Sequence, residues 1–563
     1  MMRETWRLLA SPVRSLSAAV YVLAASAFLS SLLALMRDRL FAHTFGAGTE
    51  LDLYYAAFRI PDLLFVVVGS LVSVYILIPE LVRRSSDEQK KYVDTIIAGF
   101  SLLALVLSSC AFIFAPALLG ALFPPFAEEG LLPTLVLLAR IMLLQPILLG
   151  LSNIFASITQ VRERYFLFAL SPILYNLGII AGLLVFYPLL GISGLAWGVV
   201  LGASLHVGVQ APSVVRDGFL SRLPRVRDLR ALLETCAISI PRTLALSMNQ
   251  VVFLGFTVLA AALSAGSISV FMFAFNLVGV PLSVIGASYS VAAFPTLSSA
   301  LSGGRVHEYI EHVSTAARYV LFWSLPAIAL IVVLRAHIVR VVLGSGSFDW
   351  TDTRLTAAVF ALLALSLAAQ GLALLFTRAY YAAGRTFVPF FIAFGSSVAT
   401  IALAQFFINI FSESRFTDVA ERIMRLEGVP GSDILALPLA YSLVSVLGTS
   451  VLIWHFQRKF GGVFVRIRSA LWQSFLAAIA TAGTAYITLF FLSPLTLSST
   501  LLSVFSRGLA GGCAGLAAGV FVYWILGNQE YRDTITALRG RLWRTQPSPH
   551  AVASAEEVGP ANP

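Results

Sequence analysis

The chain has 563 residues, of which 58% are hydrophobic and only 12% are charged, and its mean hydropathy is +0.87. A soluble protein carries roughly 25% charged residues, so this composition excludes a water-facing globule of this size. The net charge of +10 comes from 38 Lys and Arg residues against 28 Asp and Glu residues. These cations lie mostly in short gaps between apolar runs, which indicates loops at an anionic membrane surface and argues against nucleic-acid binding.

Apolar runs follow one another along the chain. A helix that spans a membrane needs about 20 mostly apolar residues. Such runs are too long and too uniformly apolar for the strands of a membrane barrel. The sequence therefore predicts an all-α integral membrane protein with about fourteen transmembrane helices: 17–37, 58–82, 94–121, 131–158, 167–189, 192–210, 231–261, 265–296, 313–334, 353–380, 388–411, 433–456, 469–493 and 502–526.

The distribution of Lys and Arg predicts the orientation. With the N-terminus placed in the cytoplasm, 25 of the 38 cations fall in cytoplasmic segments, nine fall in outer segments and four fall inside helices. Because cytoplasmic loops of membrane proteins are enriched in Lys and Arg, this bias places both termini in the cytoplasm. We expect a multi-pass protein of the bacterial cytoplasmic (inner) membrane.

A weak internal repeat divides the chain. An offset of 217 residues pairs Phe58 with Phe275, Gly69 with Gly286 and Ser73 with Ser290. Two six-helix lobes related by a parallel repeat, followed by two extra helices, would produce this match. The predicted organisation is a cytoplasmic N-terminus (1–16), a first lobe (17–210), a basic linker (211–230), a second lobe (231–457), two helices with a preceding basic loop (458–527) and a cytoplasmic tail, partly disordered (528–563).

Charged residues in or beside helices are the first candidates for substrate binding. A charge inside a membrane helix is costly and needs a partner, a wet cavity or a route to the interface. The densest group is Arg37-Asp38-Arg39, followed by Asp52 and Arg59. Arg37, Arg39 and Arg59 suit a phosphate, which guanidinium groups bind in a bidentate manner. Alternatively, these arginines complement a helix dipole or join two helices through Arg–Asp pairs.

Two later helices add candidates. Arg242 lies near the cytoplasmic end of the seventh predicted helix, and either contacts the substrate or extends to the headgroups. Asn276 occupies the repeat position of Arg59 in the eighth helix, where we expect it to face the cavity between the lobes. Asn249 and Gln250 are better explained by hydrogen bonds between helices.

Enzymatic chemistry is not indicated. The seven histidines are scattered, no zinc-protease motif or phosphate-binding loop is present, and no paired carboxylates form a metal motif. The three cysteines, Cys110, Cys236 and Cys513, all lie in apolar runs without metal-ligand spacing. We therefore expect a transporter without a bound cofactor or metal.

One stretch of sequence resembles a known family. Arg37 to Ala42, Phe45 to Gly48, Asp52, and Ala56 to Leu64 are similar in order and spacing to the N-terminal signature of the MurJ/MviN family. Ser171 to Asn176 resembles that family's motif in the fifth helix. These proteins are lipid II flippases of the multidrug/oligosaccharidyl-lipid/polysaccharide exporter superfamily, and the resemblance covers roughly residues 17 to 527.

The resemblance implies a substrate and a mechanism. The substrate would be lipid II, the undecaprenyl-pyrophosphate-linked peptidoglycan precursor, flipped from the inner to the outer leaflet by alternating access for cell-wall synthesis. Arg37 and Asp52 match two charged positions that the family uses in its central cavity. Membrane lipids, and the machinery of cell-wall synthesis, would be the partners.

The chain also departs from the family pattern. Ser31 and the pair Phe65-Val66 stand where the family usually has arginines, and Asn276 and Gly279 replace an arginine and a glutamate. We expect Arg59, Arg242 and Asn276 to provide part of the missing polar contact.

The membrane potential alone could drive export of an anionic diphosphate. Whether a coupling ion takes part is left open at this stage, because the sequence shows no obvious site for one. Two alternatives remain at this stage: an exporter of another polyprenyl-linked glycan or small molecule, and a transport-dead scaffold for cell-wall synthases.

Overall fold

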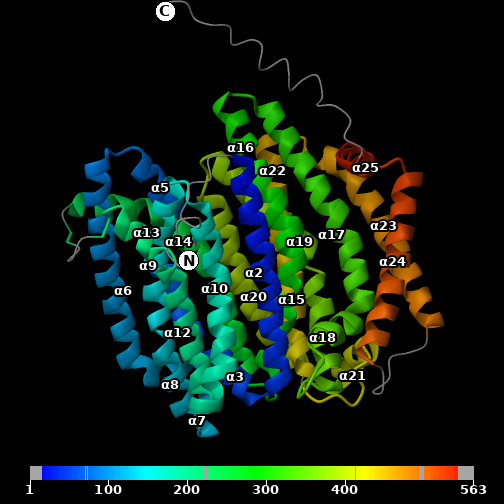
Figure 1. The fold of residues 1–563 in the computed structure, drawn as a ribbon. Helices are drawn as coiled ribbons and strands as arrows, with labels where there is room; N and C mark the ends of the chain where they lie inside the picture. The colour runs from blue at the N-terminus through cyan, green and yellow to red at the C-terminus, as the bar shows by residue number, and fades with distance from the viewer. Residues whose placement is uncertain are drawn as a thin grey trace, which may run out of the picture.

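The computed structural model describes residues 16–69, 72, 74–220, 225–226, 228–411, 414–492 and 500–542, and within these ranges it is helical and contains no strand. Long helices run between two ends of the molecule (Figure 1). One end carries α25 (Gln529–Leu542), and the other carries α21 (Ser414–Met424). We refer to them as the α25 end and the α21 end.

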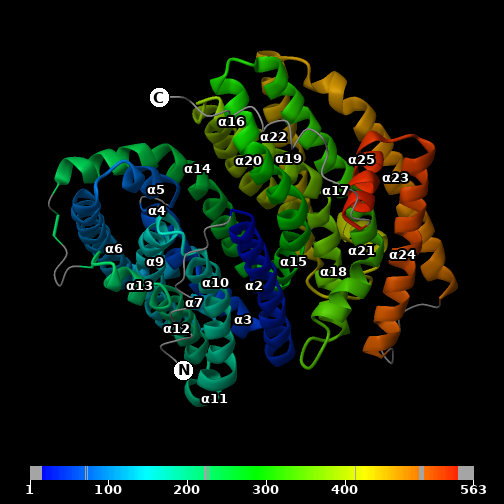
Figure 2. The ribbon, with the colours of Figure 1, turned by 45° about the horizontal axis from the view of Figure 1, so that its top comes forward.

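The first lobe is built from the N-terminal part of the chain, and α2 lies between it and the second lobe (Figure 2). Its elements are α2 (Leu16–Phe45), α3 (Thr49–Ala57), α4 (Arg59–Gly69), α5 (Val74–Val82), α6 (Ser86–Leu122), α7 (Pro124–Glu128), α8 (Leu132–Met142), α9 (Leu144–Val161), α10 (Tyr165–Ala181), the π-helical segment η2 (Gly182–Phe186), α11 (Tyr187–Leu190), α12 (Ser193–Gly208) and α13 (Ala211–Arg216).

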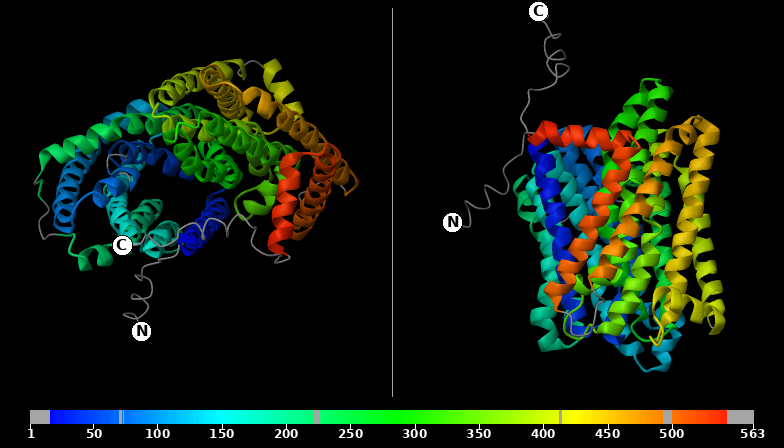
Figure 3. Two further views of the ribbon diagram at one scale, coloured as in Figure 1. Left: turned by 90° about the horizontal axis from the view of Figure 1, so that it is seen from above. Right: turned by 90° about the vertical axis from the view of Figure 1, so that its right-hand side faces the viewer.

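The second lobe is built from the part of the chain that follows the first lobe. Its elements are α14 (Leu229–Ala261), α15 (Ser267–Leu282), the π-helical segment η3 (Ser283–Ala287), α16 (Ser288–Ser302), α17 (Val306–Val342), α18 (Trp350–Ala364), α19 (Leu367–Ala382), α20 (Phe387–Phe411), α21, the 3-10 turn η4 (Ser432–Leu435) and α22 (Ala436–Phe460). Two further helices, α23 (Val463–Phe491) and α24 (Leu501–Ile525), pack on the outside of α17 and lead to α25 (Figure 3).

The membrane-spanning character predicted from hydropathy is confirmed. Among the described residues, ten helical segments are long and apolar enough to cross a membrane, and the pair α18–α19, which bends by 43°, makes an eleventh if it is counted as one span. These eleven coincide with eleven of the predicted spans. The other three predictions, 17–37, 58–82 and 231–261, correspond to α2, to α4 with α5, and to α14, and parts of all three lie outside the described residues or side chains. The total of fourteen spans therefore stays a prediction.

The two glycines of one predicted repeat pair both lie in helical segments. Gly69 is the last residue of α4, and its partner Gly286 lies in the π-helical segment η3. A Cβ at Gly286 would be 2.7 Å from the Cα of Gly371 in α19. The absence of a side chain therefore lets these two helices approach closely, as small residues do in membrane proteins.

The buried apolar residues form several clusters, and one of these includes residues from both lobes. One large cluster includes residues from both lobes, among them Phe41, Tyr54, Phe273 and Phe348. Two other clusters each belong mainly to one lobe: one surrounds Tyr92 in the first lobe, and the other surrounds Tyr309 in the second.

The helix α14 packs against both lobes. It contacts α4 and α6 of the first lobe and α20 of the second. At its start, the hydroxyls of Tyr92 and Thr235 are 3.0 Å apart, which attaches this half of α14 to α6. The long helix therefore bridges the lobes, as the view from above also shows (Figure 3).

Candidate functional site

The charged triplet Arg37-Asp38-Arg39 lies near the end of α2, about 12 Å of helical rise before its last residue. The Arg37 guanidinium donates to Asp38 Oδ1 from Nε at 3.0 Å and from Nη2 at 2.8 Å. Asp38 is only 2% exposed, whereas the Arg37 side chain is 19% exposed. The pair leaves Arg37 Nη1 and Asp38 Oδ2 directed to other helices.

Asn176 of α10 holds the other side of the guanidinium. Its Oδ1 accepts a hydrogen bond from Arg37 Nη1 at 3.3 Å. Its Nδ2 donates to the carbonyl oxygen of Pro172 at 3.1 Å and to Ser30 Oγ at 3.3 Å. Because the amide nitrogen is used in this way, the amide oxygen faces Arg37.

The second lobe reaches the same carboxylate through α15. Asn276 Nδ2 donates to Asp38 Oδ2 at 2.9 Å. Asp38 therefore accepts from Arg37 with one oxygen and from Asn276 with the other. We call Arg37, Asp38, Asn176 and Asn276 the Asp38 network; it connects α2, α10 and α15.

The Asp38 network has no net charge, because one carboxylate balances one guanidinium. This balance, together with hydrogen bonds to both carboxylate oxygens, stabilises an ion that would otherwise be costly to bury. Three of the five guanidinium N–H groups of Arg37 are used in the described contacts, so two remain for an anion. The arrangement suits reversible binding of an anionic group rather than covalent chemistry.

Asp52 does not join this network. It lies in α3 and is 3% exposed. Its carboxylate accepts from Gly266 N at 2.7 Å, from Ser269 N at 2.8 Å and from Ser269 Oγ at 2.6 Å. These groups belong to the start of α15, so Asp52 satisfies backbone donors at a helix N-terminus in the opposite lobe. Contact between Asp52 and the substrate stays a prediction.

Arg39 also connects the lobes at the α21 end. Its Nη1 donates to the carbonyl oxygens of Val341 and Val342, at 2.6 and 3.1 Å, in the last turn of α17. Carbonyl groups at a helix C-terminus lack partners within the helix and carry partial negative charge, which an arginine complements. A substrate role for Arg39 is likewise a prediction.

The turn between α2 and α3 is fastened to the second lobe by backbone groups. Ser347 N donates to the His43 carbonyl oxygen at 2.9 Å, and Ala47 N donates to Asp352 Oδ2 at 3.1 Å. Gly46 adopts a φ of +64°, and a Cβ there would be 2.7 Å from the Ser347 carbonyl oxygen. Glycine therefore meets both the conformational and the steric requirement of this contact.

Arg59 is buried, with 5% exposure, at the start of α4. Its Nε donates to the Tyr55 carbonyl oxygen at 3.0 Å, and the guanidinium carbon is 5.8 Å from the ring centroid of Phe253 in α14. Met272 of α15 lies within 3.9 Å of Nη2. Of Arg242, only the backbone in α14 is described, and its side chain lies outside the described part of the structure.

Of the six predicted site residues, Arg37 and Asn276 meet at Asp38. Asp52 and Arg39 make separate contacts with the second lobe, and Arg59 packs against α14 and α15. All five described candidates thus lie at the junction of the lobes.

A family model described as "Lipid II flippase MurJ" matches residues 41–506 of this sequence. The match covers more than half of the chain. The chain belongs to the MurJ family. Lipid II flippases are transporters, so the prediction of a transporter rather than an enzyme is confirmed, together with the resemblance noted in the first two helices.

Individual relatives agree with this assignment. The chain is 27% identical over 394 residues to a probable lipid II flippase MurJ of Buchnera aphidicola subsp. Schizaphis graminum, which covers 69% of this chain and 76% of the relative. It is 25% identical over 401 residues to the lipid II flippase MurJ of Burkholderia cenocepacia, which covers 69% and 78% of the two chains.

Solved structures share the fold. A lipid II flippase MurJ in an inward closed conformation superposes with a TM-score of 0.70 at 22% sequence identity, covering 92% of this chain and all of the other. A multidrug-resistance MATE transporter of the MOP superfamily in an inward-facing conformation gives a TM-score of 0.60 at 14% identity, covering 76% and 94%. The predicted fold class of two helical lobes with two additional helices is thereby confirmed.

Within this MurJ-family fold, two residues of the Asp38 network were not among the predicted site residues. Asp38 stands between two arginines near a helix end, and a carboxylate in that position signals an ion pair. Asn176 closes the segment Ser171 to Asn176 that resembles the family's motif in the fifth helix. Its distance of 139 residues from Arg37 in the sequence concealed their contact.

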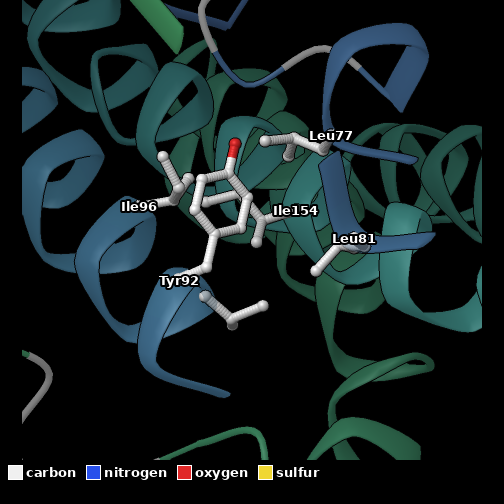
Figure 4. A pocket seen from close by; sticks show the side chains of 6 residues that line it. Leu77, Leu81, Tyr92, Ile96 and Ile154 are labelled. Carbon is white, nitrogen blue, oxygen red and sulfur yellow. The ribbon is translucent and has the colours of Figure 1, made fainter. Parts of the chain in front are cut away.

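A small pocket elsewhere in the first lobe is unsuited to a charged headgroup. It lies between α5, α6 and α9 and is lined by apolar side chains around Tyr92 (Figure 4). No group of three or more His, Cys, Asp or Glu residues that could hold a metal ion occurs in the described part of the chain.

Proposed function

We propose that this chain carries lipid II from the inner to the outer leaflet by alternating access, and that the Asp38 network binds its diphosphate. Membership of the MurJ family supports the activity. The observation that carries the site is the bridging of the lobes by one buried carboxylate, Asp38, beside a partly exposed guanidinium, Arg37. Binding at this junction would influence both lobes at once.

The network offers a way to couple binding to movement. A diphosphate oxygen is a strong acceptor for the two remaining N–H groups of Arg37. Its negative charge would also repel Asp38 and so weaken the bond from Asn276 that joins α15 to α2. A ligand shifts a conformational equilibrium only by binding one state more tightly, and this competition supplies such a difference.

The present conformation is joined at the α21 end. Asp52, Arg39 and the turn between α2 and α3 all contact the second lobe there. Around Tyr92 and Tyr309, by contrast, the lobes have separate apolar cores. The bias of Lys and Arg toward the segments that include Arg83, Arg164 and Arg305 supports a cytoplasmic α25 end, so this state would face the cytoplasm.

Complementation tests the activity and the site together. The chain is expressed in a strain depleted of its own lipid II flippase, alongside Arg37→Ala and the control Arg83→Ala, whose side chain is 78% exposed on the surface. We expect the wild type and Arg83→Ala to restore growth and Arg37→Ala to fail at equal membrane abundance. Failure of the wild type despite good expression would contradict lipid II transport, whereas full rescue by Arg37→Ala would contradict only the site.

Two further parts of the proposal concern location and partners. Both termini would be cytoplasmic, so a fluorescent reporter that folds only in the cytoplasm should be active when fused after residue 542. Contact with cell-wall synthesis machinery stays a prediction, and co-purification from native membranes would test it.

A further inference from the structure

The α21 end carries a short amphipathic helix. Phe416, Val419 and Ile423 of α21 are 55%, 58% and 67% exposed and follow one another at helical spacing along one stripe. On another side of the helix, Glu421 Oε1 accepts a hydrogen bond from Ser432 Oγ at 2.7 Å, which attaches α21 to η4. The uncovered apolar stripe is typical of a helix that lies in the interface of a bilayer.

The residue that follows α21 has an unusual backbone conformation. Arg425 has a φ of +59°, in the left-handed region that favours glycine. Two hydrogen bonds cap the C-terminal end of α21 at this residue. Leu426 N donates to the Glu421 carbonyl oxygen at 2.7 Å, and Arg425 N donates to the Arg422 carbonyl oxygen at 3.3 Å. Glycine is the residue most often found at this position of a helix end, so the presence of arginine suggests that its side chain has a function.

Arg425 lies beside another arginine. Arg335 of α17 contacts the backbone of Met424, the residue directly before Arg425. Arg335 donates from Nη1 to the Val332 carbonyl oxygen at 2.8 Å and from Nη2 to the Met424 carbonyl oxygen at 3.4 Å. Arg354 of α18 donates from Nε to the carbonyl oxygen of Arg425 at 3.1 Å, which holds the turn in place.

Backbone carbonyl and hydroxyl oxygens hold the arginines of this cluster. Among the described residues, Arg335, Arg354 and Arg425 form no salt bridge with an Asp or Glu side chain. Backbone carbonyl groups orient Arg335 and Arg354, and the Tyr486 hydroxyl orients Arg425, which leaves guanidinium N–H groups of Arg335 and Arg425 for an external anion. Two arginine side chains at the same turn favour an anionic ligand there.

The cluster opens toward the lipid side of the molecule. Arg425 Nη2 donates to the hydroxyl of Tyr486 at 3.4 Å, and Tyr486 is 52% exposed on α23. A tyrosine at this level is typical of the membrane–water interface. Arginines, an interfacial tyrosine and the apolar stripe of α21 thus lie next to one another.

We infer that Arg335 and Arg425, with Tyr486, bind the phosphate of an anionic phospholipid in the leaflet at the α21 end. The phosphate would accept hydrogen bonds from both guanidinium groups, and the acyl chains would lie against the exposed side of α21. This site is separate from the Asp38 network and does not depend on which lipid the protein transports. The contacts of Arg335 and Arg354 attach α17 and α18 to the turn after α21, so a bound lipid would stabilise this part of the second lobe.

Lipid-dependent thermal stability tests the inference on the full chain in neutral detergent. Phosphatidylglycerol should raise the unfolding midpoint of the wild type, whereas zwitterionic phosphatidylcholine should raise it less. The key variant is Arg425→Gly, which removes the guanidinium and suits the left-handed backbone, so its fold should be retained. We expect its apparent affinity for phosphatidylglycerol to fall about tenfold or more, as the loss of a charge-assisted hydrogen bond implies.

The control is Arg422→Ala, which removes one exposed positive charge from α21 three residues earlier. It should respond to phosphatidylglycerol like the wild type. Equal responses of Arg425→Gly and the wild type would overturn the site. A response to undecaprenyl diphosphate without a response to phosphatidylglycerol would overturn the assignment to a phospholipid and indicate the transported lipid instead.

Discussion

Asp38 has to satisfy two demands that conflict. A buried carboxylate is stable only when its charge is balanced and its oxygens accept hydrogen bonds, and Arg37 and Asn276 provide both. Yet the bond to Asn276 joins the two lobes, so it must break whenever they separate at this level. The neutral amide of Asn276 forms a weaker hydrogen bond to a carboxylate than an arginine would, so the lobes can separate at a lower cost in free energy.

This difference in partner strength predicts an order of effects. Asp38→Asn leaves Arg37 without its counter-ion and should lower the free energy of unfolding by about 2–3 kcal/mol. Asn276→Ala removes one hydrogen bond from a neutral donor and should cost about 1–2 kcal/mol. Denaturant or thermal unfolding in detergent would measure both, with the exposed Asp87→Asn as a control expected to change stability by about 0.5 kcal/mol or less. A larger loss in Asn276→Ala than in Asp38→Asn would contradict the assignment of Asp38 as the centre of the network.

The residues of the site could be predicted in part from their chemistry. An arginine in an apolar helix is conspicuous, and Arg37 and Arg39 stand out for that reason. Their partners are less evident, because Arg39 bonds to carbonyl oxygens about 300 positions away and Asp52 bonds to the backbone of α15. Backbone acceptors and donors have no signature in the sequence, so only the folded chain reveals that these charges fasten helix ends.

At the scale of helices, hydropathy predicted the positions of the membrane-spanning segments well, but it did not predict the breaks, bends and π-helical segments within them. The range 131–158 is divided into α8 and α9 around Leu143, and 353–380 bends by 43° between α18 and α19. The π-helical segments η2 and η3 were also not predicted. A window of about twenty residues records polarity, whereas a bend or a π-turn changes the hydrogen-bonding pattern without changing polarity.

Glycines determine how closely two of these helices pack. A Cβ at Gly182, which follows α10, would be 2.5 Å from the Cα of Gly198 in α12, and Gly202 repeats the four-residue spacing. Such spacing of small residues lets backbones approach in membranes, where dispersion contacts replace the hydrophobic driving force. The spacing is visible in the sequence, but the identity of the partner helix is not.

A pair of substitutions in α12 tests this packing. Gly198→Val places a branched side chain against the backbone of η2 and should lower stability by about 1–3 kcal/mol or prevent folding. Gly208→Val adds the same side chain to the same helix at a position with no atom within 4 Å of the new Cβ, and should behave like the wild type. The yield of monodisperse protein and its unfolding midpoint are the measurements. Similar behaviour of the two variants would show that the close approach of α10 and α12 does not limit stability.

At the scale of the whole molecule, the contacts between the lobes are asymmetric. Hydrogen bonds from Asp52, Arg39 and the turn near Gly46 close the α21 end, and the separate cores around Tyr92 and Tyr309 leave the other end less connected. Opening the α21 end requires all these bonds to exchange with water. A bound lipid that prefers the open state would supply part of the free energy for that exchange.

The membrane potential is the energy source that the cargo itself suggests. A diphosphate moving outward across a membrane that is negative inside gains about 2.3 kcal/mol per charge for each 100 mV. In proteoliposomes with a defined orientation, a valinomycin-induced potassium potential, negative on the side of the α25 end, should therefore accelerate lipid II export several-fold. A potential of the opposite sign should slow it. A pH gradient imposed without a potassium gradient or valinomycin should leave the rate unchanged. A rate that ignores the potential and follows a sodium or proton gradient would instead require a coupling ion.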